Sequence, residues 1–198
     1  MKGILSGTLA AFAALAIAGS ASAQSLPLSL EIRGGLPFPT GELNDVGNDI
    51  GDGLGPGYTL GGSVTLDVAP RVGVYAGYTF TRFDVEGFEE IGLRTDGFDA
   101  GLRLALPTTT GIGPWVKGGL VYHDAEVLFD EEVQSNPREI DVSERKLGFE
   151  VGGGVEIRLG QTLSFTPGVS YVRFNTDEGF SNRDVSYIKG DVGLRMRL

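Results

Sequence analysis

The sequence predicts an all-β fold: a closed, eight-stranded antiparallel up-and-down β-barrel that spans a membrane. Eight stretches alternate apolar and polar residues with the period of two that belongs to a β-strand. The connections between the stretches alternate long and short, as in membrane barrels with long loops at one end and tight turns at the other. The polar side of these stretches carries both charge signs and many glycines, which suits a narrow lumen filled by side chains.

Residues 1–23 are predicted to be a secretory signal peptide, and residues 24–198 to form one barrel domain. Lys2 gives a positive start, residues 4–18 are almost wholly apolar, and Ala21-Ser22-Ala23 has the small-x-small pattern of a cleavage site. No other run approaches the roughly 18 apolar residues that a spanning helix needs.

The predicted strands are 26–36, 58–68, 72–82, 93–106, 113–125, 143–159, 163–173 and 185–198. Four connections, 37–57, 83–92, 126–142 and 174–184, are long, acidic and rich in Gly, Asn or Pro, whereas 69–71, 107–112 and 160–162 are short turns. Pro167 lies within the seventh stretch and has no N–H to donate, so we expect a bulge or a lost ladder bond there. The fifth stretch loses its alternation after Tyr122, which predicts that its far end is already loop.

The last stretch shows the two faces most clearly. One face is apolar (Ile188, Val192, Leu194, Met196, Leu198), and the other is charged (Lys189, Asp191, Arg195, Arg197). A soluble carrier barrel of the lipocalin type would turn the apolar face inward. The glycines decide the matter, because they lie on the polar face and make room for long charged neighbours in a tight interior: Gly61, Gly73, Gly77, Gly97, Gly101, Gly119, Gly152, Gly154, Gly168 and Gly193. We therefore place the charged face inside and the apolar face against lipid.

Five acids and seven bases are predicted to project into the lumen: Glu31, Arg33, Asp99, Arg103, Lys117, Glu150, Glu156, Arg158, Lys189, Asp191, Arg195 and Arg197. Unpaired buried charges cost several kcal/mol each, so mutual pairing into a plug is the favoured interpretation. A gated or small ion-conducting path is the alternative, and the width of the lumen decides between them.

The remaining composition argues against other classes of partner. The net charge of −10, with no stripe of Lys and Arg, argues against nucleic acid. The absence of cysteine excludes a disulfide framework, although the chain is expected to be exported. No catalytic, cofactor-binding or metal site is predicted.

Three features invite a functional interpretation. His123, the one histidine, lies beside Asp124, but its strand offers no serine at a fitting spacing for a lipid hydrolase, so we interpret it as a rim residue facing solvent or headgroups. The acidic, Gly-rich segment 44–53 offers oxygen ligands for Ca²⁺ but lacks the helix-flanked loop spacing and a closing Glu, so a solvated loop is favoured over a metal site. Aromatic residues near strand ends are expected to form interfacial girdles: Phe38, Tyr58, Phe80, Phe83, Trp115, Tyr122, Phe129, Tyr171, Phe174, Phe180 and Tyr187.

Over residues 24–198 the chain resembles the small outer-membrane barrels of Gram-negative bacteria, the OmpA-like and opacity-protein-like family of porin-type barrel domains. The terminal strand resembles the insertion signal of such proteins, although it ends in Leu198 where an aromatic residue is usual and has Met196 where Tyr is common. The resemblance implies an outer-membrane location, contact with outer-membrane lipids including lipopolysaccharide, and recognition by the barrel assembly machinery. The ligand of the extracellular loops stays open.

The favoured function is therefore a non-enzymatic envelope protein with a structural or surface-interaction role, whose loops carry any specificity. A small porin-like channel for ions or small solutes is the first alternative. An enzyme acting on outer-leaflet lipid and a soluble periplasmic carrier are the others.

Overall fold

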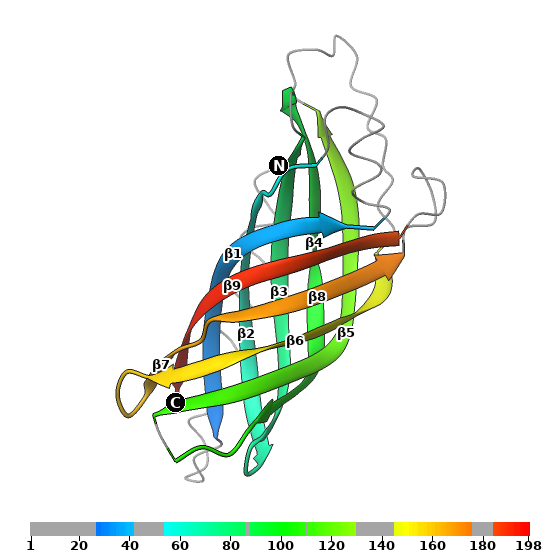
Figure 1. The fold of residues 1–198 in the computed structure, drawn as a ribbon. Helices are drawn as coiled ribbons and strands as arrows, with labels where there is room; N and C mark the ends of the chain where they lie inside the picture. The colour runs from blue at the N-terminus through cyan, green and yellow to red at the C-terminus, as the bar shows by residue number, and fades with distance from the viewer. Residues whose placement is uncertain (1–26, 42–53, 86–87, 110, 130–144, 176–183) are drawn as a thin grey trace.

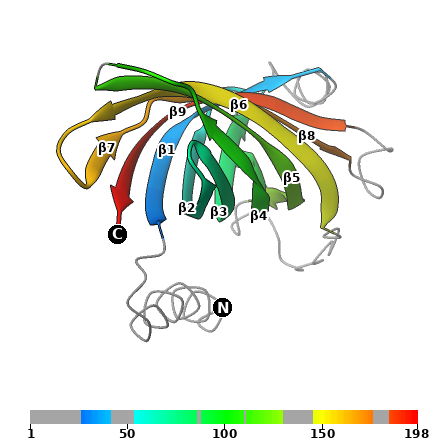
Figure 2. The same ribbon diagram turned by 90° about the horizontal axis from the view of Figure 1, so that it is seen from below.

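A computed structural model describes residues 27–41, 54–85, 88–109, 111–129, 145–175 and 184–198, which form one closed antiparallel sheet (Figure 1). Its strands are β1 (Leu28–Thr40), β2 (Tyr58–Ala69), β3 (Val72–Val85), β4 (Phe88–Ala105), β5 (Ile112–Phe129), β6 (Lys146–Arg158), β7 (Leu163–Phe165), β8 (Gly168–Asn175) and β9 (Asp184–Arg197). Consecutive strands pair from β1 to β6, β7 and β8 each lie between β6 and β9, and β1 pairs with β9, which closes the ring. Figures 1 and 2 both place β9 beside β1. The predicted closed eight-stranded barrel is confirmed, because β7 and β8 are two parts of one strand.

The division between β7 and β8 lies at Thr166 and Pro167, as the proline predicts. The pairing register with β6 and with β9 is the same on both sides of the break, so no residue is bulged out. Val155 N–H donates to the Pro167 carbonyl at 3.1 Å, but the reciprocal bond from residue 167 cannot form. Of the two expected outcomes, the structure therefore has the lost ladder bond.

Several predicted strand boundaries fall short at the end of the barrel opposite the short turns, including that of β1, which continues past residue 36 to Thr40. The predicted long connection 83–92 is mostly strand, because β3 continues to Val85 and β4 begins at Phe88. The fifth strand does not end early either, since β5 runs through residues 123–129 paired with β4. The strands β3, β4 and β5 consequently project beyond the others (Figure 1).

The predicted signal peptide and the candidate calcium segment 44–53 lie outside the described residues.

The two faces of the barrel differ as the alternation predicts. Apolar side chains on the outer face remain exposed, for example Leu60 and Leu120 at 56% and 57%. Polar and charged side chains on the inner face are buried, for example Thr65 and Glu150 at 1% each. A water-soluble protein has the opposite arrangement, whereas this one suits a barrel embedded in the hydrocarbon of a lipid bilayer.

Among the described residues, no helix is long and apolar enough to cross a membrane.

Candidate functional site

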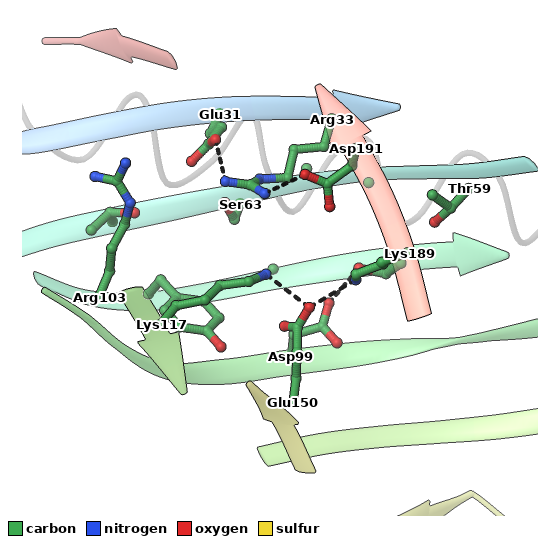
Figure 3. Close-up of a pocket in the computed structure, with 16 residues that line it drawn as sticks. Glu31, Arg33, Thr59, Ser63, Asp99, Arg103, Lys117, Glu150, Lys189 and Asp191 are labelled. Carbon is green, nitrogen blue, oxygen red and sulfur yellow. Dashed lines mark hydrogen bonds and ion pairs between the residues drawn. The ribbon is translucent and has the colours of Figure 1, made fainter. Parts of the chain in front are cut away.

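The candidate site is the charged interior of the barrel, and its centre holds two networks of ion pairs (Figure 3). In the first, Arg33 on β1 lies between Glu31 on the same strand and Asp191 on β9. Its Nη2 is 2.6 Å from Glu31 Oε1 and its Nη1 is 2.7 Å from Asp191 Oδ1. Thr166 Oγ1 also donates to Glu31 Oε1 at 2.6 Å. The network joins the first strand, the last strand and the break beside Pro167.

In the second network, one carboxylate serves two lysines. Glu150 on β6 lies with its Oε1 2.8 Å from Lys117 Nζ on β5 and 2.9 Å from Lys189 Nζ on β9 (Figure 3). The side chains of Glu150 and Lys189 are 1% and 5% exposed, so the group is almost fully enclosed. Since a buried charge without a partner is costly, the two ammonium groups depend on this one carboxylate.

Asp99 on β4 is held by two neighbours that belong to different strands. Thr79 Oγ1 donates to Asp99 Oδ2, and His123 Nε2 on β5 lies 2.8 Å from Asp99 Oδ1. His123 is only 1% exposed, so the interpretation as a rim residue facing solvent or headgroups is wrong. Its position on the polar side of the alternation, together with Lys117, is the sequence signal for an inward orientation.

A third group of charges lies nearer the short turns, around Glu156 on β6. Arg103 Nη2 is 3.0 Å and Arg195 Nη1 is 3.6 Å from Glu156 Oε2. Ser164 donates to the other carboxylate oxygen at 3.1 Å. Arg195 also lies 3.5 Å from Asp67, an acid at the end of β2 that the predicted set of lumen charges omits.

Trp115 separates this group from the centre. Its indole ring, 1% exposed, has the guanidinium carbons of Arg33 and Arg103 at 4.9 and 5.0 Å from the ring centroid. Two glycines on the facing strands make room for it, because a Cβ on Gly154 or Gly168 would approach Trp115 Cζ2 to 2.8 or 2.7 Å. The glycines of the polar face thus give space to large side chains, as their positions in the sequence predict.

The structure places ten of the predicted lumen charges within the barrel and two at its mouth. Arg158 and Arg197 are exposed at the end that carries the short turns, so they do not project into the narrow interior. Each is the last residue of its strand, where the barrel opens. Sequence parity gives the direction of a side chain but not its depth along the axis.

The interior is apolar at the end opposite the short turns, whereas the alternation predicts a polar inner face along the whole barrel. A buried cluster is formed by Leu54, Phe83, Leu93, Val121, Val172, Phe174, Val185 and Tyr187. Several members lie next to strand ends opposite the short turns, such as Phe83 near the end of β3 and Val185 near the start of β9.

The prediction of an interfacial girdle is wrong for four aromatic residues that are buried inside the barrel: Phe83, Trp115, Phe174 and Tyr187. Phe38, Tyr58 and Tyr122 are exposed on the outside. The missed signal for the apolar cluster is an inversion of the alternation, because inward apolar residues such as Phe83 alternate there with outward charged residues such as Arg82 and Asp84.

Little space remains at the centre of the interior. The cavity bounded by the central ion pairs has a volume of about 40 Å³. A larger cavity of about 470 Å³ lies at the mouth with the short turns. Within the described part of the chain, no three His, Cys, Asp or Glu side chains are grouped so that they could hold a metal ion.

Comparison with known proteins agrees with this geometry. The family model described as an outer membrane protein beta-barrel domain matches residues 8–195. Among solved structures, the crystal structure of Neisserial surface protein A is similar at 14% identity, with a TM-score of 0.65 over 86% of this chain and 97% of that one. A major outer membrane protein of Thermus thermophilus is similar at 13% identity, with a TM-score of 0.51 over 86% and 99%. No curated protein sequence matches the chain.

Proposed function

Because the chain belongs to the outer membrane protein beta-barrel family, we propose that it is a non-enzymatic integral protein of the outer membrane whose closed barrel displays loops at the cell surface. Its role is structural or one of surface interaction. The short turns face the periplasm and the longer, acidic connections face outward, as in barrels of this kind. The loops would carry any specificity, because the barrel holds them on a rigid ring.

One observation carries the proposal of a closed lumen: the charges at the centre are paired across the barrel and leave only about 40 Å³ between them. That volume accommodates a few water molecules and no hydrated ion. Beyond the ion pairs, the apolar cluster around Phe83, Phe174 and Tyr187 forms a second barrier. The two layers together support a plug.

Planar-bilayer recording tests this proposal against the small porin-like channel. The wild-type barrel should show no steady conductance, because ions would have to displace the pairs around Glu150 and cross the apolar cluster. A variant with Arg33, Lys117 and Lys189 each changed to Ala should conduct more than wild type once its folding is verified by the mobility shift on heating. Steady conductance of the wild type would establish the channel and overturn the plug.

Two further partners follow from the outer surface. Arg94 near the outer end pairs through Nε with Asp96 at 2.8 Å and has its guanidinium carbon 5.0 Å from the centroid of the Phe80 ring. Its other N–H groups fit the phosphates of lipopolysaccharide. On β9 the alternate residues Val192, Leu194 and Met196 are exposed to the outside, which supports recognition of this strand by the barrel assembly machinery. Binding of a synthetic β9 peptide to purified assembly machinery, lost when Leu194 and Met196 become Ser, would test the second partner.

A further inference from the structure

The periplasmic end of the barrel contains a cavity of about 470 Å³, which we call the periplasmic vestibule. Its wall is built from Pro27 just before β1, the β2–β3 turn, the β4–β5 connection and the ends of β6 and β9. The volume lies within the range of small-molecule pockets and is more than ten times that of the central cavity. The plug does not fill it, so the vestibule ends blindly against Trp115 and Arg103.

The charge of the vestibule is strongly unbalanced. Five of its lining residues are arginines (Arg71, Arg103, Arg158, Arg195, Arg197), and two are acids (Asp67, Glu156). Both acids are already engaged, since Glu156 pairs with Arg103 and Arg195, and Asp67 with Arg195. Among the described residues, no acidic side chain lies within salt-bridge distance of Arg71, Arg158 or Arg197. Arg71 and Arg158 therefore line the cavity without an acidic partner, and Arg197 interacts with Asp67 only at longer range than a salt bridge.

Arg71 adds an independent observation. It occupies the second position of the two-residue turn between β2 and β3, after Pro70, with φ at 76°. Among the described residues it is the only non-glycine with positive φ. Glycine takes this conformation without strain, whereas an L-residue is disfavoured there, so the turn would be better served by glycine. The structure has instead a guanidinium at the rim of the vestibule.

From the cavity, the excess charge and the position of Arg71, we infer that the periplasmic vestibule is a binding site for a phosphate-bearing anion. The guanidinium group presents a planar fork of donors that matches two phosphate oxygens, and its interaction with phosphate is among the stronger hydrogen bonds in proteins. A diphosphate, with more than one negative charge, matches an excess of three cations better than a simple monovalent anion does. The phosphate belongs either to a soluble periplasmic solute or to the headgroup of an inner-leaflet lipid at the rim.

Calorimetry on the mature barrel, folded in a phosphate-free sugar detergent at low ionic strength, tests the site with inorganic diphosphate as the probe. Saturable binding is expected. Changing both Arg158 and Arg197 to Gln should weaken it about tenfold or more, because two charge-assisted contacts are lost. The matched control changes Arg82 and Arg145 to Gln at the opposite end of the barrel, where neither lines the vestibule, and should leave binding unchanged. No saturable heat, or an equal loss in the control, would overturn the inference.

Two single substitutions separate a binding role from a structural one. Arg71→Gly should weaken diphosphate binding while leaving the unfolding free energy unchanged or higher, because it relieves the positive-φ strain. Asp67→Asn should tighten binding, because it removes one of the two acids from the wall. Unchanged affinity in both variants would contradict the site.

The source of the phosphate is distinguished by a competition experiment. Short-chain phosphatidylglycerol, added to the same detergent solution, is titrated alone and against diphosphate. Binding of diphosphate without competition from the lipid indicates a soluble solute, and displacement of bound diphosphate by the lipid indicates a headgroup. Binding of neither probe would refute a phosphate site.

Discussion

Glu150 is the residue on which the central cluster depends most, because it is the shared partner of both lumen lysines. Glu150→Gln would leave Lys117 and Lys189 enclosed without the carboxylate that they share. We expect the free energy of unfolding to fall by about 3–5 kcal/mol, the usual result of breaking a buried pair from one side.

Urea titration of the barrel folded in lipid vesicles measures this change. The matched control is Glu126→Gln on the exposed part of β5, which should stay within about 0.5 kcal/mol of wild type. Equal effects at the two positions would show that the central ion pairs contribute nothing particular to stability.

The outward residues give a second prediction, which depends on depth in the membrane. Leu120, 57% exposed in the middle part of β5, faces the hydrocarbon, whereas Leu106 lies beside the β4–β5 connection. Leu120→Arg should cost about 2–4 kcal/mol and Leu106→Arg only about 0–1, because a charge near the interface reaches water. The same titration in vesicles compares them. If both arginines were tolerated equally, the outer face would not lie in lipid.

At the scale of single residues, the sequence predicts which way a side chain points better than it predicts which residue that side chain pairs with. Parity alone places Glu31, Asp99 and Lys189 on the inner face, and the structure has them there. The pairing of Arg33 with Asp191 could not be predicted, because it requires the closing register in which Gly35 lies opposite Asp191. The prediction for His123 is wrong because it follows the nearness of Asp124 in the sequence and not the parity of the strand.

At the scale of the element, Pro167 is the clearest case in which one residue type decides local structure. Pro167→Val would supply an N–H opposite the Val155 carbonyl without changing the register, and β7 and β8 should become one continuous strand. The free energy of unfolding should change little. The added hydrogen bond stabilises the barrel by about 1 kcal/mol, and loss of the proline ring makes the unfolded chain more flexible, which destabilises the barrel by about the same amount. Amide hydrogen exchange followed by NMR in micelles should show the new amide protected. Rapid exchange at position 167 would mean that the strand is broken for another reason.

Element lengths are predicted least well where the alternation inverts, so that apolar residues point into the barrel and charged residues such as Asp124 and Glu126 point outward. The alternation that defines a membrane strand fades beyond Tyr122 on β5, which suggests a loop although the strand continues to Phe129. The cause is the apolar cluster, in which Val121 and Phe83 occupy inner positions that carry polar groups elsewhere. A prediction that assumes a polar inner face throughout cannot detect that the lining of the lumen changes from polar to apolar along the barrel axis.

At the scale of the whole molecule, the barrel has an inverted distribution of polarity. Closure through β1 and β9 leaves no sheet edge, so the backbone is satisfied within the ring, and the apolar side chains are free to face lipid. The class of fold is predictable because eight alternating stretches, alternating connection lengths and inner glycines all agree. The pairing of β1 with β9 that closes the sheet is expected for any membrane β-barrel and is not indicated by any single residue.

The sole tryptophan offers the most direct test of this distribution, because Trp115 lies inside the barrel at 1% exposure. Fluorescence of the wild-type barrel in vesicles of lipids with brominated acyl chains should be quenched weakly, since the indole is screened by the sheet. Leu120→Trp, which adds a second tryptophan on the outer face and leaves the lumen intact, should show strong quenching of the added emission. Strong quenching of wild-type Trp115, with the added tryptophan unaffected, would contradict a charged interior enclosed by an apolar, lipid-facing surface.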